Sequence, residues 1–171
     1  STTAEAAAAY NAGLERLSIN SGGITAGDTT GYLATGIRAT SNYAGADIVV
    51  QNDGGITATS IYGSNGIDVA ALGDGSSATV DNTAGITAIQ DSPYGYGAYG
   101  IVASADYNAT IDNSGGITVS SGGGGYGAMA LAFNGTASVD NSGLIDVTGY
   151  VAKGAVASSA NGAGHVGNGG N

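Results

Sequence analysis

Apolar and polar residues alternate in short runs along this chain, and the runs keep a fixed distance from a recurring asparagine. Two residues before the asparagine stands a β-branched residue: Val50, Val80, Ile111, Val139 and Val166. Four residues after it stands an isoleucine: Ile24, Ile56, Ile86, Ile117 and Ile145. Six residues after it stands a small or branched apolar residue: Ala26, Ala58, Ala88, Val119 and Val147. A period of two is typical of β-strands with one buried face, so these runs predict short strands.

The asparagine itself occurs six times, with spacings of 32, 30, 31, 28 and 27 residues: Asn20, Asn52, Asn82, Asn113, Asn141 and Asn168. Self-similarity at such a period indicates stacked structural repeats. We therefore expect an all-β fold, a parallel β-helix (solenoid) of about five to six rungs with about three short strands per rung, as one domain over residues 1–171. Equivalent residues would stack about 4.8 Å apart. The asparagine side chains would then form a hydrogen-bonded structural ladder.

A tyrosine motif lies between consecutive asparagines and precedes a small residue and an apolar residue. Aligned on that motif, the tyrosines form one column: Tyr32, Tyr62, Tyr96, Tyr126 and Tyr150. The alternation continues beyond the motif at Ala39, Val69, Ala103, Phe133 and Ala157. Two interpretations of the tyrosine column stay open. It is either an aromatic stack that shields one corner of the coil, or an exposed interaction stripe that binds glycans or a neighbouring rod.

The two ends of the sequence depart from the repeat. Residues 1–13 contain Thr2 and Glu5 in the spacing of a capping box before an alanine run, which predicts a helical cap. The alternative is an incomplete first rung, because Ala12 and Gly13 precede Asn20 as Ala44 and Gly45 precede Asn52. The last repeat begins at Asn168 without a polar capping segment. Since uncapped strand edges tend to pair, we expect either a longer solenoid or copies that stack end to end.

Composition narrows the function classes. The chain has 3 basic and 13 acidic residues and a net charge of −10, which excludes nucleic acid and disfavours anionic membranes as partners. There is no cysteine, so disulfides and thiolate metal sites are excluded. No apolar run is long enough for a membrane helix. An acidic, lysine-poor surface suits an extracellular location and binding of cations.

Few residues are candidates for metal binding or catalysis. The residue before the asparagine is acidic in three successive repeats, at Asp81, Asp112 and Asp140. Stacked carboxylates predict either Ca²⁺ along the ladder, as the only candidate cofactor, or a solvated polar face. His165 is the only histidine, so no catalytic triad can be assembled. We predict no catalytic residues and no enzymatic activity.

The phrase Val-Asp-Asn-Thr-Ala-Gly-Ile-Thr at residues 80–87 returns as Ile-Asp-Asn-Ser-Gly-Gly-Ile-Thr-Val at residues 111–119. Together with the interleaved tyrosine motif, it resembles the passenger domains of bacterial autotransporters and related filamentous-haemagglutinin-like adhesins, over residues 14–168. The resemblance implies a right-handed parallel β-helix, export across a Gram-negative outer membrane, and roles in adhesion, self-association or biofilm.

These observations together predict a non-enzymatic extracellular structural or adhesive protein on the bacterial cell surface. We expect it to self-associate by end-to-end stacking of the β-helix into fibres. One alternative is a fragment of a larger autotransporter adhesin that binds host or matrix glycans. The other is a β-helix enzyme acting on polysaccharides, which would require acidic side chains to converge in a groove.

Overall fold

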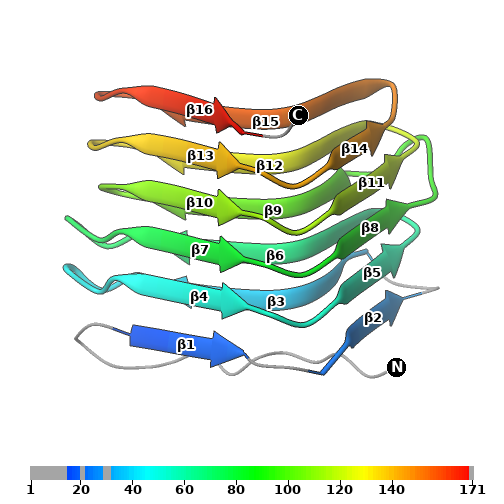
Figure 1. Ribbon diagram of the computed structural model, residues 1–171, viewed down its shortest axis with the longest axis horizontal. Helices are drawn as coiled ribbons and strands as arrows, with labels where there is room; N and C mark the ends of the chain where they lie inside the picture. The colour runs from blue at the N-terminus through cyan, green and yellow to red at the C-terminus, as the bar shows by residue number, and fades with distance from the viewer. Residues whose placement is uncertain (1–14, 20–21, 29–31, 170–171) are drawn as a thin grey trace.

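The computed structural model describes residues 15–19, 22–28 and 32–169, and it is an all-β solenoid built from three parallel sheets (Figure 1). Sheet A contains β1 (Glu15–Ile19), β4 (Ile48–Asn52), β7 (Ala78–Asn82), β10 (Ala109–Asn113), β13 (Ala137–Asn141) and β16 (Gly164–Asn168). Sheet B contains β2 (Ile24–Asp28), β5 (Ile56–Ser60), β8 (Ile86–Gln90), β11 (Ile117–Ser121) and β14 (Ile145–Thr148). Sheet C contains β3 (Ala34–Ser41), β6 (Gly63–Ala71), β9 (Gly97–Ala105), β12 (Gly124–Ala132) and β15 (Val151–Ser159).

The chain visits the three sheets in turn, so that each rung supplies one strand to each sheet. Every strand pairs in parallel with the equivalent strand of a neighbouring rung, for example β4 with β7 and β7 with β10. Figure 1 shows the rungs stacked in chain order from β1 to β16. The predicted parallel β-helix with three short strands per rung is therefore confirmed. The cap or incomplete rung predicted for residues 1–13 lies outside the described residues.

The core is a set of straight apolar columns that run along the solenoid axis. The isoleucine column of sheet B is in register, with Ile56 opposite Ile86 and Ile86 opposite Ile117. The valine column of sheet A is likewise in register, as Val50 opposite Val80 shows. These side chains are fully or nearly fully buried. The alternation in the sequence therefore predicted the inward positions of sheets A and B correctly.

A column of glycines on sheet C lies against the isoleucines of sheet B. This glycine column consists of Gly36, Gly66, Gly100, Gly127 and Gly154. A Cβ atom on Gly66 would overlap Cγ2 of Ile86, and one on Gly100 would overlap Cγ2 of Ile117. The isoleucine of each rung thus packs over the glycine of the rung before it. Only glycine leaves room for this contact, which explains why the residue recurs.

The alignment of the fourth tyrosine repeat was wrong. The connection from β8 to β9 spans residues 91–96, whereas the connection from β11 to β12 is only Gly122 and Gly123. Because this connection is shorter, Tyr126 pairs with Tyr99 instead of Tyr96. The position predicted for Phe133 is taken by Ala130, which lies opposite Ala103 in the core, and Phe133 itself is 59% exposed.

Candidate functional site

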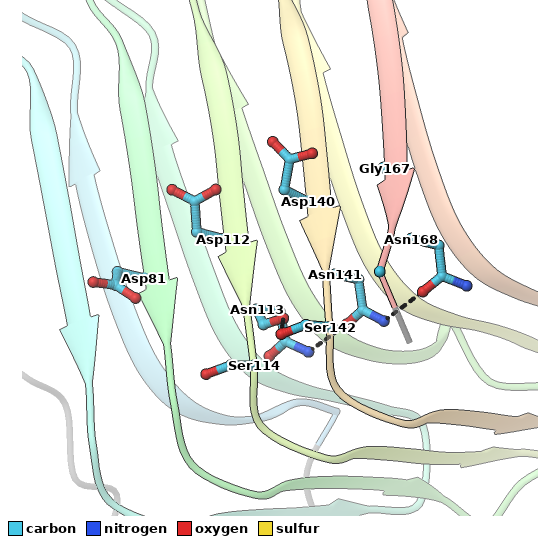
Figure 2. A pocket seen from close by; sticks show the side chains of 10 residues that line it. Asp81, Asp112, Asn113, Ser114, Asp140, Asn141, Ser142, Gly167 and Asn168 are labelled. Atoms are coloured by element: carbon cyan, nitrogen blue, oxygen red, sulfur yellow. Dashed lines mark hydrogen bonds between the residues drawn. The ribbon is translucent and has the colours of Figure 1, made fainter. Parts of the chain in front are cut away.

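The asparagine column forms a continuous chain of side-chain hydrogen bonds along one corner of the solenoid. Asn52 donates from Nδ2 to Oδ1 of Asn82 at 2.7 Å, and Asn82 donates to Asn113 at 2.6 Å. Asn113 donates to Asn141 at 2.6 Å, and Asn141 donates to Asn168 at 3.2 Å. Figure 2 shows the last members of this chain at the ends of their strands. We call these five residues the asparagine ladder.

The amides of Asn82, Asn113 and Asn141 also close their own turns. The second Nδ2 hydrogen of Asn113 is donated to the carbonyl oxygen of Gly115 at 2.8 Å, and Asn141 donates to that of Gly143 at 2.6 Å. One side chain therefore fixes the bend from sheet A to sheet B and joins it to the next rung. The first repeat differs, because the register places Ile19 opposite Asn52. Asn20, the sixth predicted member, lies outside the described residues.

A second polar ladder, which the sequence analysis missed, lies inside the corner between sheets B and C. Gln90 is 2% exposed and donates from Nε2 to the carbonyl oxygen of Ile61 at 2.9 Å and to that of Ser92. Ser121 donates to Oε1 of Gln90 at 2.7 Å. The equivalent residue of the preceding rung is Ser60, which is also buried. The column mixes serine and glutamine, so no single residue type marks it in the sequence.

The acidic column is in register, with Asp81 opposite Asp112 and Asp112 opposite Asp140. Figure 2 shows the carboxylates of Asp112 and Asp140 side by side above the ladder, while Asp81 points in another direction. The three residues border a shallow surface hollow whose floor includes Asn113 and Asn141. Partial burial raises the pKa of Asp112, and the charges of Asp140 and Asp81 raise it further.

This arrangement does not support the predicted Ca²⁺ site. Among the described residues, no three His, Cys, Asp or Glu side chains come close enough together to hold a metal ion. The carboxylates stand on the outer surface of sheet A, where Asp112 and Asp140 are exposed to solvent. Nε2 of His165 lies 3.8 Å from Oδ1 of Asp140. The geometry therefore fits the alternative interpretation, a solvated polar face.

The predicted tyrosine column is divided between two places. Tyr32 and Tyr62 stack with ring centroids 5.3 Å apart, and the backbone of Tyr96 continues their column by donating to the carbonyl oxygen of Tyr62. Tyr126 instead stacks on Tyr99 at 5.2 Å, on the outer face of sheet C. Tyr150 directly precedes β15, is 92% exposed, and donates its backbone N–H to the carbonyl oxygen of Gly123, which follows Tyr96 in the column. The predicted column of five tyrosines was therefore wrong at Tyr126.

The last rung of the described chain, β14 to β16, has an open edge. A second hollow lies there, where the core columns end, and its lining includes Ile145, Gly154, Ala155, Val166 and Asn168. Val166 continues the valine column and is 46% exposed, whereas its neighbour Val139 is fully buried. Figure 1 shows β14, β15 and β16 with a rung on one side only. We call this surface the C-terminal edge.

The fold and these surfaces define the protein as a parallel β-solenoid of stacked rungs. Comparison of the chain with models of protein families, with curated proteins and with solved structures gives no match. The resemblance to autotransporter passenger domains therefore stays a prediction. No helix in the described part of the chain is long and apolar enough to span a membrane.

Proposed function

We propose that this chain is a non-enzymatic structural subunit that self-associates end to end, by docking the first rung of one copy onto the C-terminal edge of another. The observation that carries the proposal is an unfilled position over Gly154, the last residue of the glycine column. The extracellular location rests on composition and on the resemblance to autotransporter passenger domains.

At the C-terminal edge, the glycine column lacks the isoleucine that covers its other members. Gly127 has Ile145 of the next rung packed so closely that a Cβ atom would overlap it. A Cβ atom on Gly154 would meet only Cγ2 of Ile145, at 3.9 Å, which is an ordinary van der Waals distance. Gly154 is also exposed. An isoleucine from an additional rung would fit over Gly154 as Ile145 fits over Gly127.

The opposite edge of the described chain offers such an isoleucine. Ile24 is the first described member of the isoleucine column and is only partly buried. A second copy placed with β2 beside β14 and β3 beside β15 would therefore continue the isoleucine column. Sheet A has six strands and sheets B and C have five, so β16 would then take the place of β1 in the second copy, beside β4. The copies would join head to tail, and a head-to-tail contact that does not close into a ring produces an open filament.

Backbone hydrogen bonding favours the same arrangement. The strands β14, β15 and β16 each pair with the preceding rung only, so the outer edges of all three sheets are unpaired in the same rung. Exposed strand edges are templates for pairing with another chain. Apolar side chains remain exposed at this edge, including Leu144 at 77% and Val151 at 44%. Docking would pair three edges and bury these side chains in one step.

Gly154→Val tests the proposal by filling the position over the last glycine. We expect the wild-type chain to form thin fibres in negative-stain electron microscopy, and Gly154→Val to remain as discrete particles with unchanged circular dichroism. Gly116→Val is the matched control, because a Cβ atom on Gly116 meets nothing within 4 Å. It should leave the fibres intact. Wild-type particles that stay discrete at every concentration, or fibres that persist in Gly154→Val, would contradict end-to-end stacking.

A further inference from the structure

The outward faces of the three sheets differ in chemistry. Sheet A presents Thr and Asp, as at Thr79 and Asp81, and sheet B presents mostly Thr and Ser, as at Thr118 and Ser120. The outward positions of sheet C change along the solenoid. They are polar in β3 and mostly apolar in β9 and β12, while β15 presents Lys153, Val156 and Ser158. The apolar side chains are Tyr99, Val102, Tyr126, Met129, Leu131 and Val156, which we call the apolar face.

The strand register makes these side chains neighbours. Met129 lies between Val102 of β9 and Val156 of β15, and Tyr126 lies beside Tyr99. All six are partly exposed, in contrast to the buried alanines that alternate with them. Each described strand belongs to one of the three sheets, so no further described element packs over this face. A continuous apolar area on the outer face of a sheet is typical of a surface that binds another protein.

The face of sheet C differs in charge from the rest of the molecule. Arg38 and Lys153, two of the chain's three basic residues, lie on sheet C. Lys153 lies over the ring of Tyr126, with Nζ 5.4 Å from its centroid. The acidic residue on this sheet, Asp68, lies 3.5 Å from Nε of Arg38. Sheet C therefore lacks the negative charge that the whole chain carries, so two such faces can approach without strong repulsion.

From these observations we infer that the outer face of sheet C is a lateral interface, in which a second copy of this chain packs sheet C against sheet C. Isologous contacts of this kind, where the same surface is used on both subunits, are the commonest in homodimers. The twisted faces of two β-sheets pack about 10 Å apart with interdigitated side chains. Met129 and the residues around it would form the centre of that layer.

The whole outer surface of sheet C, including its polar strands, is close in size to one side of a standard interface. Sheet C has five strands, and four of them are nine residues long. At about 4.8 Å between strands and about 3.3 Å per residue, the face measures about 24 by 30 Å, or about 700 Å². A standard interface buries about 800 Å² on each partner. The outer faces of sheets A and B have a similar length but lack an apolar centre.

The lateral interface is independent of end-to-end stacking, because it uses a side of the solenoid and not its edge. Met129→Lys tests it by placing a charge in the centre of the apolar face, and Thr118→Lys places the same charge on sheet B as a control. By sedimentation equilibrium in the Gly154→Val background, where end-to-end stacking is blocked, we expect the parent chain and Thr118→Lys to form pairs. Met129→Lys should weaken pairing at least about tenfold, the factor that corresponds to about 1.4 kcal/mol. Circular dichroism checks that each variant is folded.

Cross-linking gives a second measurement that leaves the apolar face intact. The chain contains no cysteine, so a single introduced thiol reports one position only. Ser158→Cys lies beside the apolar face, and Thr118→Cys lies on sheet B. A short bismaleimide should join two copies through Ser158→Cys and give little dimer through Thr118→Cys. A monomeric Gly154→Val chain, pairs that Met129→Lys leaves unchanged, or equal cross-linking at both positions would overturn the inference. Fibres without lateral pairs would overturn it while preserving end-to-end stacking.

Discussion

The Nδ2 atom of Asn82 lies 2.6 Å from Oδ1 of Asn113 and, with its other hydrogen, 2.8 Å from the carbonyl oxygen of Ala84. One buried amide therefore connects two rungs and also fixes the bend that leads from sheet A to sheet B. Side chains that satisfy every donor inside a low-dielectric core contribute to a unique structure, and losing one leaves its partners unsatisfied. The asparagine ladder is thus both a source of stability and the feature that sets the register of the rungs.

Replacing Asn113 with alanine should strongly destabilise the solenoid. The side chain accepts a hydrogen bond from Asn82 and donates to Gly115 and Asn141, and it is 3% exposed. At about 1 kcal/mol for each bond, we expect a loss of about 3 kcal/mol in the free energy of unfolding, measured by urea titration. Asn134→Ala, at an exposed asparagine, should change it by less than about 0.5 kcal/mol. Equal effects at both positions would contradict a special role for the ladder.

Ser64→Ala should stabilise the protein. The Ser64 hydroxyl is buried without a hydrogen-bond partner, and the residues opposite it in the neighbouring rungs are Ala34 and Ala98. Removing an unsatisfied buried hydroxyl should raise the free energy of unfolding by about 1 kcal/mol. Ser121→Ala should lower it by about the same amount, since Ser121 donates to Gln90. Thermal or urea unfolding of the two variants should therefore shift the midpoint in opposite directions.

Gly100→Ala should destabilise the core even though alanine suits a strand better than glycine does. The added methyl group would overlap Cγ2 of Ile117 and the carbonyl oxygen of Gly127. Overpacking of this kind costs about 1–3 kcal/mol. Gly116→Ala is the matched control, because its methyl group would meet nothing within 4 Å. It should be neutral or slightly stabilising by urea titration, since alanine restricts the unfolded chain. A tolerated Gly100→Ala would show that the isoleucine column can move away from the glycine column.

Asp112→Asn should raise stability at neutral pH and have no effect in acid. Burial, Asp140 and Asp81 raise the pKa of Asp112 in the folded state, so folding favours its protonated form. The resulting penalty is absent below the ordinary aspartate pKa, develops as pH rises through the folded pKa, and is complete at neutral pH. Solvent screens this exposed group, so we expect a gain of only a few tenths of a kcal/mol.

Urea titrations of Asp112→Asn and wild type across that pH range measure the difference, which added salt should also reduce. Asp146→Asn, on sheet B opposite Thr118, is the control for removing one carboxylate outside the acidic column. A difference that persisted unchanged in acid would show that Asp112 acts through packing and not through charge.

The sequence predicted the parts of the fold in which one residue type recurs in successive rungs without interruption. Ile86 and Ile117 keep the same distance from their asparagines, and in the structure they lie opposite each other. The distance holds because the bend between sheets A and B has almost constant length. The corner between sheets B and C varies in length, so counting from Tyr96 to Tyr126 gave a wrong register there.

Two features were missed for different reasons, and only the first depends on that register. The apolar face is apparent only when Met129 is placed beside Val102, which requires Gly127 and not Ala130 to be aligned with Gly100. The ladder of Gln90 and Ser121 was missed because it mixes residue types. The amide of glutamine and the hydroxyl of serine can both bridge two rungs. Calcium was one of two interpretations of the spacing of Asp81, Asp112 and Asp140, but spacing along a column does not make side chains converge.

Ladder partners are always one whole rung apart, and this has a consequence for the length of the molecule. Asn82 and Asn113 are 31 residues apart and make the same contacts, each with the rung that follows. Deleting residues 83–113 would join Asn82 directly to Ser114, the residue that now follows Asn113. The remaining residues of each column would then stack on one another across the deletion. Duplicating the same segment would add one rung. The length of the protein can therefore change in steps of one rung, by unequal copying of a segment, without any change of fold.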